Sequence, residues 1–344
     1  MLINETQKAA VFKTDDGDLR ADLAQSRESM RLYAMEVEQE LNGVQELVNQ
    51  LEREQVRRLQ DVKQFQIDRV VLTSRAMATQ QETVVRRHVH AGCVLVAEMC
   101  RPRAKNAFND ALYEQLTAAL DAFEADDALH AFVLTGHGDY FTSGADVKET
   151  AAILGDGSVR PPSQSPSHAF MRRMVSCKKL LVAAVNGPAI GIGVTLLMHC
   201  DVVLAAERAT FWTPFLRIGV VPEFASSYTF PHLLGPTVAS NLVLRSKVYS
   251  AQEALAAKIV GDVLPTAGFL DAVLAELTPL VSNRFNKTSL PVYKTLLRRE
   301  REPKIREALH YEFEQLDRRA ASGEFLATVM ELKKQFANKN SSKL

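Results

Sequence analysis

Two glycine-bearing segments are places where the backbone itself could do chemistry. The first, residues 189–194 with Gly191 and Gly193, follows an apolar run at 181–186 and precedes a run at 195–199 that can be helical. Such a strand–turn–helix junction leaves N–H groups without partners at the positive end of the helix dipole. Because glycine lets a ligand approach the backbone closely, we expect an anion or a developing oxyanion there. The alternative is that these small residues serve tight helix–sheet packing.

The second segment, residues 141–148, also follows an apolar run, at 131–135, through a glycine-bearing loop. Asp146 stands where a helix could begin, so we interpret it as a helix cap rather than a catalyst. Ala145 can then present a second backbone N–H, and two such junctions side by side would hold one carbonyl oxygen from both sides. The first segment lacks the third glycine of the dinucleotide-binding pattern, which disfavours a dinucleotide as the ligand.

Both segments lie in a region where predicted strands and helices alternate. Strands are expected at 93–99, 131–135, 181–186 and 201–206, and helices at 107–125 and 168–176. From about residue 223 the pattern predicts mostly helix, with a capping box at 250–253. The sequence therefore predicts an α/β domain over 91–344, with a core to about residue 265 and a helical region over about 266–340.

Residues 1–90 have a different composition. All 13 prolines lie from Pro102 onward, and residues 1–91 contain only two glycines, Gly17 and Gly43. Apolar residues there follow a heptad, most regularly over 30–51. This predicts a helical extension that is either a coiled coil or helical hairpin, or a single amphipathic helix packed on its own domain.

The composition of the 344 residues argues against several functions. Lys and Arg number 41, as do Asp and Glu, so no nucleic acid partner is expected. The four cysteines lack C-x-x-C spacing, which favours buried free thiols over a zinc or redox site. No apolar stretch is long enough for a membrane span. The last residues, Ser342-Lys343-Leu344, predict binding to the peroxisomal import receptor and location in a peroxisome or related microbody such as a glycosome.

Four stretches, taken in order, carry a resemblance to a known family. They are residues 101–107, 143–146, 186–191 and 222–231. From about residue 94 onward the chain resembles the crotonase superfamily and, within it, the peroxisomal 3-enoyl-CoA to 2-enoyl-CoA isomerases. The resemblance implies a ββα spiral fold, assembly as a homotrimer or hexamer, and an acyl-CoA thioester as substrate. It implies no metal and no cofactor, because coenzyme A enters as part of the substrate.

By the same resemblance, the N–H groups of Ala145 and Ile192 form the oxyanion hole, although many relatives have glycine in place of Ile192. Arg103, Lys105 and Lys148 would lie near the nucleotide and pantetheine parts of coenzyme A; otherwise they are solvated surface charges. The other residues expected along the substrate are Ala107, Ser143, Gly144, Asp146, Val147 and Gly191.

The resemblance also indicates the base. Where family hydratases carry two glutamates, this chain has Thr195 and Phe215, neither of which is an acid or base near neutral pH. The isomerases carry their carboxylate where Glu223 stands, and the apolar neighbourhood of Glu223 would raise its pKa. The alternative is that Glu223 only stabilises a helix dipole from the first turn.

We therefore predict an isomerase that converts 3-enoyl-CoA to 2-trans-enoyl-CoA in the β-oxidation of unsaturated fatty acids. Glu223 would carry a proton from C2 to C4 while the two N–H groups stabilise the dienolate. One alternative is another crotonase reaction, hydration or dienoyl-CoA isomerisation. The other is a non-catalytic adaptor that binds acyl-CoA or protein.

Overall fold

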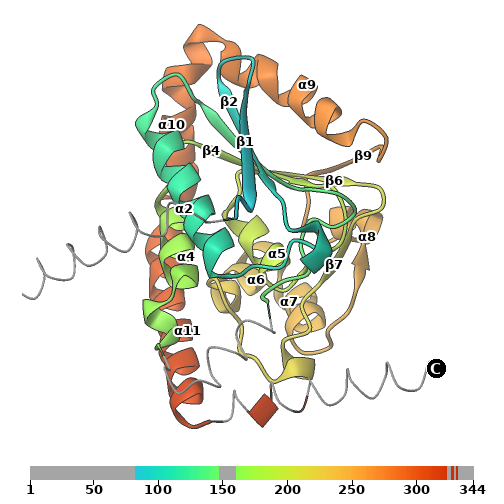
Figure 1. Ribbon diagram of the computed structural model, residues 1–344, viewed down its shortest axis with the longest axis vertical. Coiled ribbons are helices and arrows are strands. Elements are labelled where there is room, and N and C mark those ends of the chain that lie inside the picture. The colour runs from blue at the N-terminus through green and yellow to red at the C-terminus, as the bar shows by residue number, and fades with distance from the viewer. Residues whose placement is uncertain (1–81, 147–159, 324–326, 329–330, 332–344) are drawn as a thin grey trace, which may run out of the picture. The chain divides into compact units, whose positions relative to one another are not determined.

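A six-stranded sheet frames the part of the chain that the computed structural model describes, which is residues 82–146, 160–323, 327–328 and 331. In spatial order its strands are β1 (Val85–His90), β2 (Val94–Met99), β3 (Ala131–Gly136), β4 (Leu180–Val185), β6 (Val202–Ala206) and β9 (Asp262–Leu264). β1 is antiparallel to β2, and every later pair of neighbours is parallel (Figure 1). The carboxyl ends of the parallel strands therefore lie at one edge of the sheet.

Several predicted features lie outside the described residues: most of the 1–90 extension, Val147, Lys148 and the tripeptide 342–344. Chain contacts group Thr83–Leu344 into one compact unit that is distinct from Met1–Glu82. β1 belongs to the sheet of this unit, so the sheet begins before the boundary predicted near residue 90.

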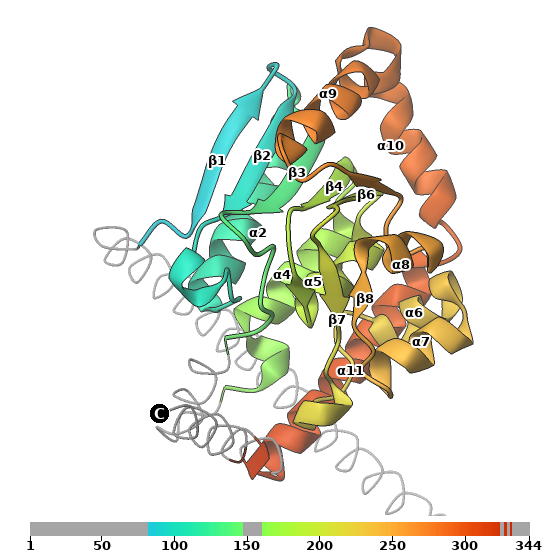
Figure 2. The ribbon, with the colours of Figure 1, turned by 90° about the vertical axis from the view of Figure 1, so that its right-hand side faces the viewer.

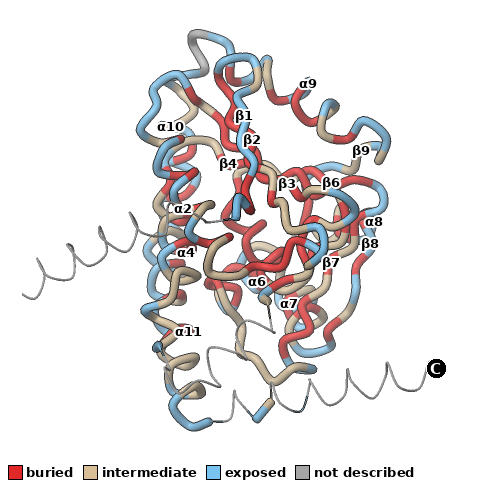
Figure 3. Tube along the Cα trace, in the orientation of Figure 1, coloured by how far each residue is buried: buried red, intermediate tan, exposed pale blue. Residues whose placement is uncertain are grey.

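Both faces of the sheet are covered by helices. On one face, side chains such as Leu95 and Leu134 pack in a core with α2 (Asp110–Ala125) and α4 (Pro166–Ser176). On the other face, side chains such as Val96 and Val133 pack against α9 (Phe269–Ser282). Figure 2 shows these helices on the two sides of the sheet, and Figure 3 shows the central strands to be largely buried, whereas the edge strand β1 is mostly exposed. Burial on both faces explains why the central strands β2, β3 and β4 are nearly continuous apolar runs in the sequence.

The helical C-terminal region consists of α9, α10 (Arg284–Arg298) and α11 (Glu302–Ala321). α10 is attached to the sheet by a buried ion cluster, in which Asp201 lies 2.8 Å from Lys294 Nζ and 2.6 Å from an Arg298 nitrogen. The same carboxylate accepts a hydrogen bond from the backbone N–H of Leu181. No helix in the described part of the chain is long and apolar enough to cross a membrane.

A second, three-stranded sheet carries one of the glycine-bearing segments. Its strands are β5 (Ala189–Ile190), β7 (Thr210–Trp212) and β8 (Tyr249–Ser250), with β7 in the centre. The remaining elements are short: η1 (Pro102–Ala104), η2 (Pro162–Gln164), α5 (Ile192–Thr195), η3 (Leu196–His199), η4 (Leu216–Ile218), α6 (Ser226–Leu234), α7 (Pro236–Val243) and α8 (Ala251–Ala256).

The predicted α/β architecture with its helical C-terminal region is confirmed, and so is the predicted capping box at 250–253. Ser250 and Glu253 form the reciprocal capping box at the start of α8. The helix predicted from residue 107 instead begins at Asp110, because the Asn109 side chain accepts a hydrogen bond from the Leu112 N–H and caps it there. Residues 107 and 108 are thereby left free to contact the loop after β3.

Candidate active site

The two glycine-bearing segments follow β3 and β4 and lie side by side. The Thr142 N–H donates to the Pro188 carbonyl at 3.1 Å, and the Ile190 N–H donates to the Thr142 carbonyl at 3.0 Å. Gly144, at φ +89°, approaches so closely that a Cβ added there would lie 3.0 Å from the Ile190 carbonyl oxygen. A side chain at Gly144 would therefore push the two loops apart.

The N–H of Ala145 points away from the neighbouring strand-like segment. Phe108 donates its N–H to the Gly144 carbonyl and accepts from the Asp146 N–H, both at 2.8 Å. In such a parallel bridge the residue between these two partners directs its own N–H to the opposite side. Ala145 is exposed, and within the described residues no hydrogen bond uses its N–H as donor. It is thus available to a ligand.

Within the described residues, the N–H of Ile192 also lacks a hydrogen-bond acceptor, for a different reason. Ile192 is the first residue of α5, and the first N–H groups of a helix have no acceptor within it. Gly191, at φ +56°, donates to the Trp212 carbonyl at 2.8 Å and accepts from Val194, which fixes the start of the turn. Ile192 is fully buried as a whole residue, so its side chain fills core space and its N–H is covered by protein in this structure.

Gly193 serves packing, as the alternative interpretation of this segment predicted. A Cβ on Gly193 would lie 2.4 Å from Thr142 Cγ2, so the segment packs tightly against the opposite loop. Close packing and ligand approach are compatible here, because the first depends on Gly193 and the second on the N–H of Ile192.

A buried asparagine holds the loop of Ala145 in place. The Asn106 side chain donates to the carbonyls of His137 and Tyr140 and accepts from the Arg101 N–H, at 2.8–2.9 Å. Its backbone carbonyl accepts from Thr142 Oγ1 at 2.7 Å, and that hydroxyl oxygen accepts from the Gly144 N–H at 3.1 Å. Neither Asn106 nor Thr142 was predicted as a site residue, although Asn106 falls within a matching stretch.

Asp146 forms an ion pair with Arg101, at 3.0 Å. The Arg101 guanidinium also donates to the Ala107 carbonyl, so it ties the segment before α2 to the end of the Ala145 loop. The helix that Asp146 was expected to cap would begin outside the described residues. Within them, this carboxylate is engaged by a cation.

The residues expected to meet coenzyme A surround η1. Arg103 and Lys105 are exposed, and Lys105 Nζ lies 4.9 Å from the centre of the Tyr140 ring. Ser143 donates its N–H to the Lys105 carbonyl at 2.9 Å and its hydroxyl to the Ala104 carbonyl at 3.2 Å. These bonds attach the exposed cations to the loop that carries Ala145, while Lys148 and Val147 lie outside the described residues.

Glu223 lies in the turn between η4 and α6. The residue keeps partial access to solvent, and the protein around it removes much of the hydration of its carboxyl group. Burial, and then the charge of Glu312, raise the pKa of Glu223 from 4.5 to about 7. A carboxylate with such a pKa is a stronger base than an ordinary glutamate, and about half of it is ionised near neutral pH.

A chain of aromatic contacts runs from Phe224, the residue after Glu223, to Phe108, the residue that pairs with Ala145. Phe108, which bridges to Ala145, has its ring centre 5.0 Å from that of Tyr113. Burial, and then the charge of Glu223, raise the pKa of the Tyr113 phenol, so this phenol lies near the Glu223 carboxylate. Phe170 lies 6.0 Å from Phe108 and 6.2 Å from Phe224, which follows Glu223. These rings are buried, so the core between the Ala145 loop and the turn after Glu223 is largely apolar.

The profile of a known family, described as enoyl-CoA hydratase/isomerase, matches residues 90–336. The chain belongs to this family. It is 39% identical over 207 residues to human enoyl-CoA delta isomerase 2, covering 59% of this chain and 51% of the relative. It is 35% identical over 209 residues to mouse enoyl-CoA delta isomerase 3, peroxisomal, covering 60% and 64%. The chain thus spans between about half and two thirds of these curated relatives.

Solved structures give the same assignment of the fold. The crystal structure of an enoyl-CoA hydratase/isomerase from Pseudoalteromonas atlantica T6c superposes with a TM-score of 0.67 at 30% identity, covering 74% of this chain and 98% of that one. The predicted crotonase-type fold is thereby confirmed. The family name covers hydratases and isomerases, so membership alone does not decide the reaction.

The two positions that the resemblance assigns to the hydratase glutamates hold buried side chains that are not acids. Thr195 is fully buried and its hydroxyl donates to the Ile192 carbonyl at 3.4 Å, while Phe215 is 3% exposed. Neither side chain can activate a water molecule. In the described part of the chain, no three His, Cys, Asp or Glu side chains are grouped so as to hold a metal ion.

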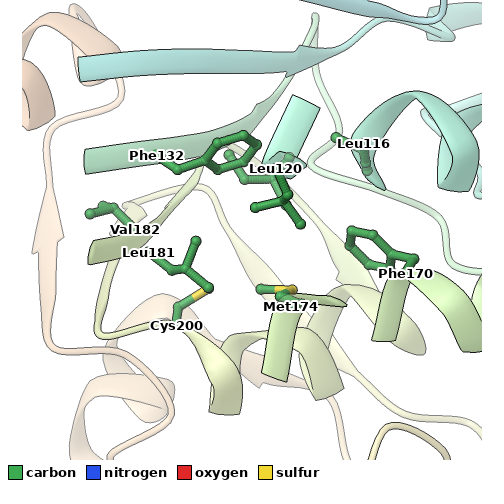
Figure 4. Close-up of a pocket in the computed structure, with 9 residues that line it drawn as sticks. Leu116, Leu120, Phe132, Phe170, Met174, Leu181, Val182 and Cys200 are labelled. Atoms are coloured by element: carbon green, nitrogen blue, oxygen red, sulfur yellow. The ribbon is translucent and has the colours of Figure 1, made fainter. Parts of the chain in front are cut away.

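A small void lies elsewhere, between the sheet and helices α2 and α4. Figure 4 shows its lining of apolar side chains and Cys200; the residues are Leu116, Leu120, Phe132, Leu134, Phe170, Met174, Leu181, Val182 and Cys200. Burial raises the pKa of the Cys200 thiol to about 12, so the group is neutral. The void offers no polar group that could orient a thioester, and we assign it to the hydrophobic core.

Proposed function

We propose that this chain isomerises 3-enoyl-CoA to 2-trans-enoyl-CoA. The observation that carries the proposal is the combination of one carboxyl group of raised pKa, Glu223, with Thr195 and Phe215 in place of the hydratase glutamates. Hydration of a double bond needs groups that activate and deliver water, whereas a double-bond shift needs one base and a stabilised enolate.

In the proposed reaction the thioester oxygen accepts hydrogen bonds from the N–H groups of Ala145 and Ile192. The Glu223 carboxylate removes a proton from C2, and the electron pair of that C–H bond moves toward the carbonyl to form a dienolate. The two N–H groups stabilise the negative charge on oxygen; one such donor typically accounts for about a hundredfold to a thousandfold in rate. The protonated Glu223 then returns the proton to C4, which leaves the double bond between C2 and C3.

Coenzyme A enters this scheme as part of the substrate. Arg103 and Lys105 are exposed next to the loop of Ala145, which suits contacts to phosphate groups. Lys148 remains a prediction of the same kind.

Direct assays on two substrates test the proposal. We expect purified protein to convert a trans-3-enoyl-CoA, such as 3-hexenoyl-CoA, to the 2-trans isomer, and to hydrate 2-trans-hexenoyl-CoA far more slowly. Faster hydration than isomerisation would favour the hydratase alternative. Tight binding of the CoA ester with no turnover of either substrate would favour a non-catalytic adaptor.

Assembly and location are proposals as well. α10 exposes apolar side chains, among them Tyr293, Leu296 and Leu297 at 61–79% exposure, which suits a homotrimer or hexamer and can be checked by light scattering. A peroxisomal location is supported by the tripeptide 342–344 and by the name of the mouse relative. A fluorescent fusion that stays in peroxisomes after deletion of residues 342–344 would exclude this tripeptide as the address.

A further inference from the structure

One buried carboxylate has no part in the reaction proposed above. Glu312 is 4% exposed and lies in α11 on the stripe formed by Ile305, Leu309 and Phe313, which faces the core. The spacing of these residues is that of one helical face. A carboxylate on such a face loses its hydration, so its retention requires partners inside the protein.

Its partners are two amides of the turn that follows Glu223. Glu312 Oε2 accepts from the Ala225 N–H at 2.6 Å, and Oε1 accepts from the Ser227 N–H at 2.8 Å. One carboxylate therefore accepts two hydrogen bonds at the N-terminus of α6, from the residue that precedes the helix and from its second residue. Within the described residues, no Lys, Arg or His forms an ion pair with Glu312 or with Glu223.

The turn that Glu312 holds has a strained backbone. Phe224 and Ala225 have φ values of +58° and +56°, in the left-handed region that costs a residue with a side chain free energy. From the opposite side, His199 donates from Nε2 to the Phe224 carbonyl at 2.7 Å. The pKa of His199 is lowered to about 3 by burial, so this donor is neutral. Two partners from distant elements thus fix the conformation that places Glu223.

We propose that Glu312 is a positioning residue for the base: by holding the amides of Ala225 and Ser227 it fixes the turn that aims Glu223, and its negative charge acts on Glu223. The inference rests on the proposed function of Glu223. Burial raises the pKa of Glu312 to about 7, while the two amide bonds oppose the rise and favour the ionised form. We therefore take Glu312 to ionise at lower pH than Glu223, so that its negative charge raises the pKa of Glu223.

The other titratable groups near this pair do not offer a competing explanation. Burial raises the pKa of Tyr113 and lowers that of His199, so both are neutral over the pH range of an assay. Arg298 is paired with Asp201. The remaining neighbours are Tyr228 of α6, Arg301 beside α11, and His168 of α4, whose ring centre lies 4.2 Å from that of Phe313 with the two rings tilted.

The test is the pH profile of kcat/KM for 3-enoyl-CoA isomerisation. Glu312→Gln keeps one acceptor oxygen and removes the charge, so we expect the rising limb to move to lower pH by about one unit, with KM little changed. Glu307→Gln, on the exposed side of the same helix, is the matched control and should leave the limb in place. A purely structural role for Glu312 would lower kcat without moving the limb.

A second variant covers the case in which Glu312→Gln does not fold. Glu312→Asp keeps the charge but is too short to reach both amides, so we expect kcat to fall at least about tenfold while the limb stays near pH 7. An unmoved limb in folded Glu312→Gln, or unchanged kcat in Glu312→Asp, would overturn the inference. Glu223→Gln in the same series separates the two proposals: full activity in that variant would refute the role of Glu223 itself.

Discussion

Replacing Glu223 by glutamine should stabilise the protein at alkaline pH, and the structure gives the size of the effect. The unfolded chain holds a glutamate of pKa 4.5, whereas the folded chain holds one of about 7. Between these values the folded state binds a proton that the unfolded state has lost, so the free energy of unfolding falls as pH rises through this window. Above pH 7 the whole penalty is present, and it corresponds to about 3 kcal/mol.

Glutamine has no charge to desolvate, so Glu223→Gln should exceed wild type by about 3 kcal/mol at pH 8 and equal it at pH 4. Urea denaturation at both pH values measures the difference, with Glu207→Gln, an exposed glutamate, as control. A gain confined to pH 8 would also show that the ionised Glu223 lowers the free energy of unfolding, as expected of a side chain that is retained for its function. Equal stabilities at pH 8, or the same gain at pH 4, would refute the claim that the folded protein disfavours the ionised form of this carboxyl group.

Two further substitutions test the parts that hold the site. Gly144→Ala places a Cβ 3.0 Å from the Ile190 carbonyl oxygen and should lower kcat about a hundredfold by separating the amides of Ala145 and Ile192. The control is Gly92→Ala, at a similar positive φ with open space around it, which should leave kcat unchanged. Asp201→Ala leaves Lys294 and Arg298 buried without their carboxylate and should lower the free energy of unfolding by about 3–5 kcal/mol, measured by urea denaturation. Asp139→Ala breaks only the exposed pair with Arg208 and should lower it by less than about 1 kcal/mol.

The parts of the fold and site that the sequence predicts are those with local causes. Apolar runs buried on both faces identify the central parallel strands, and glycines after two of these strands identify the loops that present Ala145 and Ile192. The capping box at Ser250 needs only four residues. The resemblance added the choice of Glu223, which a lone glutamate between Pro222 and Phe224 does not establish.

The parts that were missed depend on contacts between distant residues. β5, β7 and β8 have only two or three residues each, too few for any periodicity, and exist because they pair with one another. Thr142 helps to hold the Ala145 loop only because its hydroxyl bonds to Asn106. Glu312 holds the turn after Glu223 only because it accepts from two amides that lie 85 and 87 positions away in the sequence. Glu312 did leave a trace, since a glutamate on the apolar stripe of α11 requires a buried partner. Tyr113 left none, because it falls among the core residues of α2.

The central claim is that Glu223 alone moves the proton. Turnover of a 3-enoyl-CoA by Glu223→Gln, measured together with its affinity for the same thioester, tests this most directly. The account predicts that kcat falls by about a hundredfold to ten-thousandfold while binding is retained. Turnover at the wild-type rate in a folded Glu223→Gln protein would contradict it.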